Sequence, residues 1–141
     1  MVTLELEADA ALFEGKIKGI VLAFYENERP LQGLAGEMDW RFQGVVSKYI
    51  KAGAISGKEG ECVYVPAEKN GKTYHLILAG AGPLSATGKR GAIPQKTWSA
   101  VKKNLTSLKL EQIGISRLDF THGDESLFTK NLKGLPLWIV P

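Results

Sequence analysis

The sequence has too few cysteines, histidines and long apolar runs to build a disulfide, a zinc centre or a membrane span. Its 141 residues include one cysteine, Cys62, and two histidines, His75 and His122. A lone cysteine cannot form an internal disulfide, and these dispersed residues give no zinc-ligand spacing. No run approaches the roughly 18 consecutive apolar residues of a membrane helix. The acidic start, MVTLELEADA, is also unlike a secretory signal. We therefore expect a cytoplasmic protein without a metal, a cofactor or a membrane anchor.

Acidic residues are absent from one long segment of the chain. Between Lys69 and Leu110 there are eight lysines and arginines and no aspartate or glutamate. Because the whole chain has a net charge of +3, the remaining residues together carry −5. Charge blocks of this kind bear on partners rather than on fold. The asymmetry therefore favours a protein partner or self-association.

Complete nucleotide-binding fingerprints are missing from the glycine-rich segment HLILAGAGPLSATGKRGAI, residues 75–93. The dinucleotide motif requires a third glycine where Ser85 stands, because that glycine lets helix and strand pack closely. A P-loop has four residues between its glycines, then lysine and a hydroxyl residue, whereas five residues separate Gly82 from Gly88 here. We interpret the segment as a strand that leaves the sheet through a turn. The alternative is an anion or phosphorylated-ligand site formed by Gly80, Gly82, Ser85, Thr87, Gly88, Lys89 and Arg90.

Catalytic constellations are missing as well. No G-x-S-x-G elbow is present, and no serine or cysteine has a recognisable base and orienting group near it. The acidic pairs Glu26/Glu28 and Glu59/Glu61 flank turns, where solvated sheet edges are the simpler interpretation. We expect no catalytic residues and no enzyme activity.

The residues that are present alternate between strand and helix patterns. Strands are predicted over residues 3–8, 19–26, 61–66, 74–80, 111–120 and 135–140, and Asn70-Gly71 predicts a hairpin between the third and fourth. Helices are predicted over residues 38–53, from Pro94 to Leu108, and over 124–132 with Asp124 as N-cap. This order indicates one domain, residues 1–141, with a mixed sheet and helices on both sides.

The second predicted helix is basic. Its inner stripe is Trp98, Val101, Leu105 and Leu108, and its other faces carry Lys96, Lys102, Lys103 and Lys109. Lysine is the ordinary solvent-facing residue of an amphipathic helix, so a solvated surface is the first interpretation. Contact with nucleic acid or with an acidic protein partner are the alternatives.

Read in order, these segments resemble the N-terminal domain of the leucyl (cytosol) aminopeptidase family. The resemblance extends from about Gly19 to Phe120 and rests on several weak motifs that follow one another in the family's order. They are Pro30-Leu31-x-Gly33, the Asp39 helix that ends at Gly53, the turn from Ile55 to Glu61, Val65-Pro66, and the strand end Leu78-Ala79-Gly80-Ala81-Gly82. The family's usual Gly-Leu-Gly-Lys is replaced here by Gly-Ala-Gly-Pro.

The resemblance implies a three-layer α/β/α fold like that of macro domains, with a mixed central sheet. In that family the chemistry resides in a separate C-terminal domain, whose metal-ligand string Asn-Thr-Asp-Ala-Glu-Gly-Arg does not occur here. We therefore predict a stand-alone, non-catalytic binding or regulatory module. The resemblance to macro domains leaves binding of ADP-ribose through residues 80–91 as one alternative. DNA binding by some family members leaves nucleic-acid contact through helix 94–109 as another.

Overall fold

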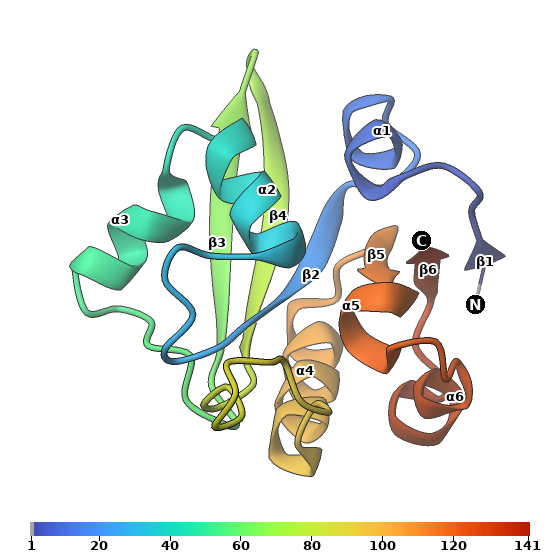
Figure 1. Ribbon diagram of the computed structural model, residues 1–141. Coiled ribbons are helices and arrows are strands. Elements are labelled where there is room, and N and C mark those ends of the chain that lie inside the picture. The colour runs from blue at the N-terminus through green and yellow to red at the C-terminus, as the bar shows by residue number, and fades with distance from the viewer. Residues whose placement is uncertain (1) are drawn as a thin grey trace.

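The strands form a mixed sheet with a helical layer on each face (Figure 1). Successive side chains of the central strands point to opposite faces of the sheet, and apolar side chains form a core on each face. The computed structural model describes residues 2–141, which form one sheet in the order β1-β6-β5-β2-β4-β3. The strands are Val2–Thr3 (β1), Gly19–Phe24 (β2), Cys62–Lys69 (β3), Lys72–Gly80 (β4), Ile113–Ser116 (β5) and Leu137–Val140 (β6). The helices are Ala8–Phe13 (α1), Gly33–Arg41 (α2), Val45–Lys51 (α3), Gln95–Leu108 (α4), Arg117–Thr121 (α5) and Ser126–Leu132 (α6). The predicted three-layer α/β/α fold is confirmed.

β2 lies near the middle of the sheet and is buried on both faces. Ile20, Leu22 and Phe24 face the core beneath α1, α2 and α3. Val21 and Ala23 face the second core, beneath α4, α5 and α6. A strand covered by helices on both sides is apolar along its whole length, which is why GIVLAF contains no polar side chain.

The predicted hairpin is confirmed. β3 pairs antiparallel with β4 from Cys62↔Ala79 to Lys69↔Lys72, and Asn70 and Gly71 both have positive φ at the turn. All other strand pairs are parallel. Within the hairpin, the Tyr64 hydroxyl lies 2.6 Å from His75 Nδ1, so this histidine is hydrogen-bonded inside the sheet.

The single helix predicted over residues 38–53 is wrong, because the chain forms two helices there. α2 ends at Arg41 and α3 begins at Val45. Between them Gln43 and Gly44 have φ values of 56° and 84°, a left-handed backbone that no right-handed helix accommodates. The apolar periodicity continues across the break, because Met38, Phe42 and Val46 all reach the same core, and this hid the break from the pattern.

Two predicted strands are much shorter than expected. The period-two pattern of residues 3–8 gives a strand only over Val2–Thr3, and residues 8–13 form α1, which was not predicted. The strand predicted over residues 111–120 ends at Ser116, whose hydroxyl accepts a hydrogen bond from Asp119 N at 3.1 Å and caps α5. Serine at this position favours a helix start over a longer strand.

The helical segments near the C-terminus agree with prediction apart from their ends. α4 buries Trp98, Val101 and Leu105, but Leu108 at its last turn is exposed. Pro94 is the residue before the first helical turn, and the N-cap of α6 is Glu125, one residue after Asp124. No helix formed by residues 2–141 is long and apolar enough to cross a bilayer.

Candidate functional site

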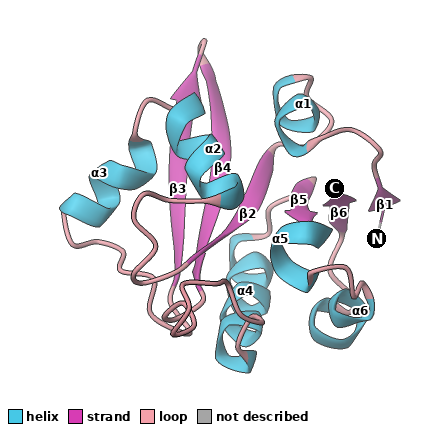
Figure 2. Cartoon of the chain, viewed as in Figure 1, coloured by secondary structure: helices cyan, strands magenta, loops and turns pink. Residues whose placement is uncertain are grey.

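The carboxyl ends of β2, β4 and β5 meet at one edge of the sheet (Figure 2). The chain leaves β2 toward α2 on one face, whereas it leaves β4 and β5 toward α4 and α5 on the other. In open α/β sheets such a reversal is the usual place for a ligand. The connections after β2 and β4 lie side by side here, since Leu84 N donates to Asn27 Oδ1 at 2.7 Å.

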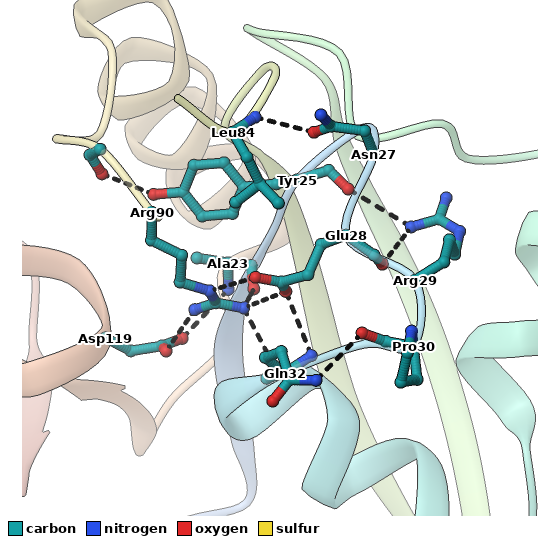
Figure 3. A network of polar contacts seen from close by, with 11 residues as sticks. Ala23, Tyr25, Asn27, Glu28, Arg29, Pro30, Gln32, Leu84, Arg90 and Asp119 are labelled. Atoms are coloured by element: carbon teal, nitrogen blue, oxygen red, sulfur yellow. Dashed lines mark hydrogen bonds and ion pairs between the residues drawn. The ribbon is translucent and has the colours of Figure 1, made fainter. Parts of the chain in front are cut away.

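Arg90 occupies this edge with its own side chain (Figure 3). Its Nε and Nη2 donate to the two carboxylate oxygens of Glu28 at 2.7 and 2.6 Å, and its Nη1 donates to Asp119 Oδ1 at 2.8 Å. Nη2 also lies 3.0 Å from Gln32 O and 3.3 Å from Ala23 O. Glu28 is 4% exposed and Asp119 is 9% exposed. We call Arg90, Glu28 and Asp119 the Arg90 cluster.

The surrounding backbone is shaped to admit the Arg90 cluster. Gly33 has φ +59°, and a Cβ at this position would lie 2.7 Å from Asp119 Oδ1 and 2.8 Å from Arg90 Nη1. The Tyr25 ring lies 5.1 Å from the guanidinium carbon, and its hydroxyl donates to Gly91 O at 2.6 Å. The connection after β4 is therefore held at two consecutive residues, Arg90 and Gly91.

The two carboxyl groups respond differently to the same arginine. Burial acts to raise the pKa of Glu28, but the hydrogen bonds from Arg90 and Gln32 and the arginine's charge together lower it below the ordinary value. Burial raises the pKa of Asp119 and outweighs the opposing effect of Arg90 and of the Ala23 amide. For Arg90, burial acts to lower the pKa, and the two carboxylates raise it. The bidentate Glu28 pair is thus the stronger half of the cluster.

The solvated sheet edge predicted for Glu28 is wrong, because this residue is buried. Arg90 was predicted to bind an anion, whereas its guanidinium pairs with Glu28 and Asp119. The partners are 62 and 29 residues away along the chain, so no local sequence pattern indicated them.

Two of the predicted glycines of the 80–91 segment, Gly80 and Gly82, have structural roles. Gly80 N donates to Glu61 O at 2.8 Å, and Gly82 N donates to Gly57 O at 2.8 Å. A Cβ on Gly80 would collide with the carbonyl of Lys58, and Gly82 has φ +82°. Their amides therefore pair with backbone carbonyls, and the missing side chains permit close packing and a turn.

The remaining predicted residues of that segment, Ser85, Thr87, Gly88 and Lys89, lie together on an exposed turn. Ser85 N donates to Lys89 O at 2.9 Å and Gly88 N to Ser85 O at 2.8 Å. The Ser85 hydroxyl accepts from Lys89 N at 3.1 Å. Three amides of the turn are thus bonded within it, and Lys89 is an exposed residue. An anion site at this turn stays a prediction.

The four lysines of the predicted basic helix are all exposed, three on α4 and one at its C-cap, namely Lys96, Lys102, Lys103 and Lys109. None of them pairs with a carboxylate of residues 2–141. The solvated surface expected for them agrees with this placement, and their contact with nucleic acid stays a prediction. Across the same residues, no three histidine, cysteine, aspartate or glutamate side chains gather as they would around a metal ion.

A groove between α2 and α3 was not predicted. It encloses about 550 Å³ and is lined by the loop before α2 and by both helices. Trp40 lies on its wall with 77% of its surface exposed. The assumption of one continuous helix concealed it, because the groove exists only where α2 and α3 separate at Gly44.

Comparison with known proteins places the chain in a family. Residues 20–132 match the N-terminal domain of the cytosol aminopeptidase family. A probable cytosol aminopeptidase of Burkholderia orbicola is 29% identical over 106 residues, which are 72% of this chain and 20% of that protein. One from Nitrosococcus oceani is 28% identical over 108 residues, 77% of this chain and 21% of that protein. The chain thus spans about a fifth of the length of these relatives.

Solved structures share the fold at low sequence identity. The macrodomain of Thermus aquaticus DarG has a TM-score of 0.71 at 12% identity and covers 99% of this chain and 97% of its own. Thermosipho africanus DarTG in complex with ADP-ribose has a TM-score of 0.62 at 13% identity, and the match covers 92% of this chain and 39% of that one. A tomato leucine aminopeptidase mutant has a TM-score of 0.61 at 15% identity, and the match covers 100% of this chain and 32% of that one. The chain belongs to the cytosol aminopeptidase family through its N-terminal domain, and this domain has a macrodomain-like fold.

Proposed function

We propose that this domain is a non-catalytic protein-interaction module. The observation that carries the proposal is the Arg90 cluster, because it places the chain's own guanidinium at the sheet edge where α/β folds usually hold a ligand. A bidentate, buried arginine–carboxylate pair is a stable arrangement that an incoming ligand must first separate. Binding on the outer surface requires no such separation.

The distribution of charge supports the same proposal. The exposed lysines of α4 and of the 85–89 turn come from the segment that has no acidic residue, and the N-terminal residues Glu5 and Glu7 are acidic. Surfaces of opposite sign steer partners of complementary charge and accelerate their association. The proposal is therefore a salt-sensitive complex with another protein or with a second copy.

The proposal is tested by isolating the tagged chain from its native cells and reconstituting any co-purifying protein from separately purified components. We expect a complex of fixed stoichiometry that weakens as salt is raised. A strictly monomeric chain without a stoichiometric partner contradicts the proposal. Hydrolysis of a leucyl peptide by the pure chain, lost on addition of a chelator, contradicts its non-catalytic part.

The second candidate function is binding of ADP-ribose or a related phosphorylated molecule. It is favoured by the likeness to Thermosipho africanus DarTG in complex with ADP-ribose and by the exposed Lys89 and hydroxyls of the 85–89 turn. A ligand with a dissociation constant about a hundredfold below its concentration stabilises a protein by about 2.7 kcal/mol. This candidate therefore predicts a rise of several degrees in melting temperature with ADP-ribose, reduced in Lys89→Ala, and the interaction module predicts no rise.

A further inference from the structure

The groove between α2 and α3 has an apolar wall that the domain itself leaves uncovered. Pro30, Leu31, Trp40 and Ile50 contribute to its lining. Trp40 is 77% exposed, the largest exposed fraction among the large apolar side chains of residues 2–141. Exposed apolar side chains gathered at a concave surface are typical of a contact site, and tryptophan is among the residues that most often dominate binding energy.

The position of Trp40 is supported by its neighbours. The guanidinium carbon of Arg41 lies 5.6 Å from the Trp40 ring centroid. Arg41 is itself fixed by an ion pair with Asp9, at 2.7 Å. The Arg41 guanidinium thus packs against the indole, and a contact of this kind lowers the entropy lost when a partner covers the ring.

The charged groups at the groove leave it with an excess of positive charge. Arg29 and Lys51 line it and are exposed, and neither forms an ion pair with another described residue. Asp39 is the one carboxylate in the lining. Its two oxygens already accept from Ser47 N at 2.9 Å and from Ser47 Oγ at 2.6 Å, so they stabilise the start of α3. An occupant that complements this groove combines an apolar side chain with negative charge.

We propose that the α2–α3 groove binds a short segment of a partner protein in which a large apolar side chain is flanked by carboxylates. The apolar side chain covers Trp40 and Ile50, and the carboxylates pair with Arg29 and Lys51. This inference rests on the proposed interaction function and adds its location and the chemistry of the partner. A nucleotide fits the groove less well, because Asp39 already occupies the amide end of α3 where a phosphate would otherwise bind.

The test is a display library of short peptides with one fixed large apolar position and flanking positions that are free to be acidic, neutral or basic. We expect selection on the pure domain to enrich acidic flanks. The enriched peptide, made with a fluorescein label, is then titrated and followed by fluorescence anisotropy. Trp40→Ala is expected to weaken it about tenfold or more, as for a central aromatic contact, and Lys51→Glu is expected to weaken it and to remove part of its salt dependence.

Two control variants match these changes elsewhere on the surface. Leu118→Ala removes an apolar side chain on α5 that is 72% exposed, and Lys109→Glu reverses a charge at the end of α4. Both are expected to change the affinity less than about twofold, as surface substitutions outside a contact do. Circular dichroism of each variant confirms that it is folded, and Trp40 is exposed enough for its loss to be tolerated.

Enrichment of neutral or basic flanks, no enrichment, or equal affinity of Trp40→Ala and Leu118→Ala overturns the proposal. The two proposals fail separately. A reconstituted protein partner whose binding survives Trp40→Ala and Lys51→Glu leaves the interaction function standing and removes the groove. Absence of both a partner and an enriched peptide removes both.

Discussion

Arg90 donates five hydrogen bonds to groups that come from the loop after β2, from β2 itself and from α5. Its removal leaves the carboxylates of Glu28 and Asp119 buried without a counterion. Breaking one partner out of a buried ion pair typically costs about 3–5 kcal/mol. We therefore expect Arg90→Ala to lower the free energy of unfolding by an amount of that order, measured by urea denaturation.

Arg117 provides the matched control for Arg90. It pairs with Glu125 at 2.9 Å on the surface, where both side chains are substantially exposed. Exposed ion pairs contribute about 0–1 kcal/mol, so Arg117→Ala is expected to change the stability little. Similar effects of the two substitutions contradict a structural role for the Arg90 cluster.

Cys62 is expected to be an unreactive thiol. Burial, with a smaller contribution from the Glu61 charge, raises its pKa to about 12. The unfolded chain releases this proton near pH 8.5 and the folded chain does not, so stability falls as pH rises from about 8.5 toward 12. We expect the unfolding midpoint to decline more steeply over that range in the protein than in Cys62→Ala. Equal slopes contradict the raised pKa.

At the residue scale, the positions of the turn glycines were predictable from the sequence, but the ion pairs of the charged residues were not. Gly80 and Gly82 stand where a strand leaves the sheet, and this local requirement is visible in the sequence. The pairing of Glu28 with Arg90 depends on how the connections after β2 and β4 approach each other, so it was not visible. Trp40 fell outside the apolar stripe of its helix and attracted no prediction.

At the scale of elements, the start of α3 depends on a side chain from α2. Asp39 accepts a hydrogen bond from Ser47 N, an amide that has no partner within the helix. Loss of such a cap typically costs about 1 kcal/mol, so Asp39→Ala is expected to destabilise the domain by that order in urea denaturation. Asp39→Asn retains an acceptor and is expected to cost less. Equal losses for the two variants contradict the capping role.

The turn between α2 and α3 is tested separately. Gly44 has φ +84°, and a Cβ there would meet nothing within 4 Å, so only backbone conformation opposes a side chain. Gly44→Ala is expected to cost about 1–2 kcal/mol because left-handed backbone is unfavourable for alanine. Gly91, equally open but without this φ, is the control, and Gly91→Ala is expected to be neutral or slightly stabilising. The reverse order contradicts the account of the break.

Elements with a consistent local signal were predictable, namely β2, the β3–β4 hairpin and α4. The break at Gly44 was not, because apolar positions recur at helical spacing on both sides of it. Residues 117–120 were predicted as part of a strand because the apolar pattern of β5 continues into α5. The Ser116 cap that ends the strand is a local signal that the pattern obscured.

At the scale of the molecule, alternation of strands and helices predicted an α/β domain with a mixed sheet. The specific macrodomain-like arrangement followed from the order of several weak motifs and not from any single one. The location of the proposed binding surface was not predictable from the sequence, since it depends on which side chains fill the sheet edge and which surface is left uncovered. Those are consequences of long-range packing.

Titration of the isotopically labelled protein with ADP-ribose, followed by amide chemical shifts, tests most directly whether binding avoids the sheet edge. With Arg90 paired to Glu28 and Asp119, the account predicts no saturable shifts at millimolar ligand. Saturable shifts at micromolar ligand, concentrated in residues 25–33, 82–93 and 116–122, would contradict it. Shifts in residues 25–33 and 116–122 would show that the ligand binds at the sheet edge despite the Arg90 cluster.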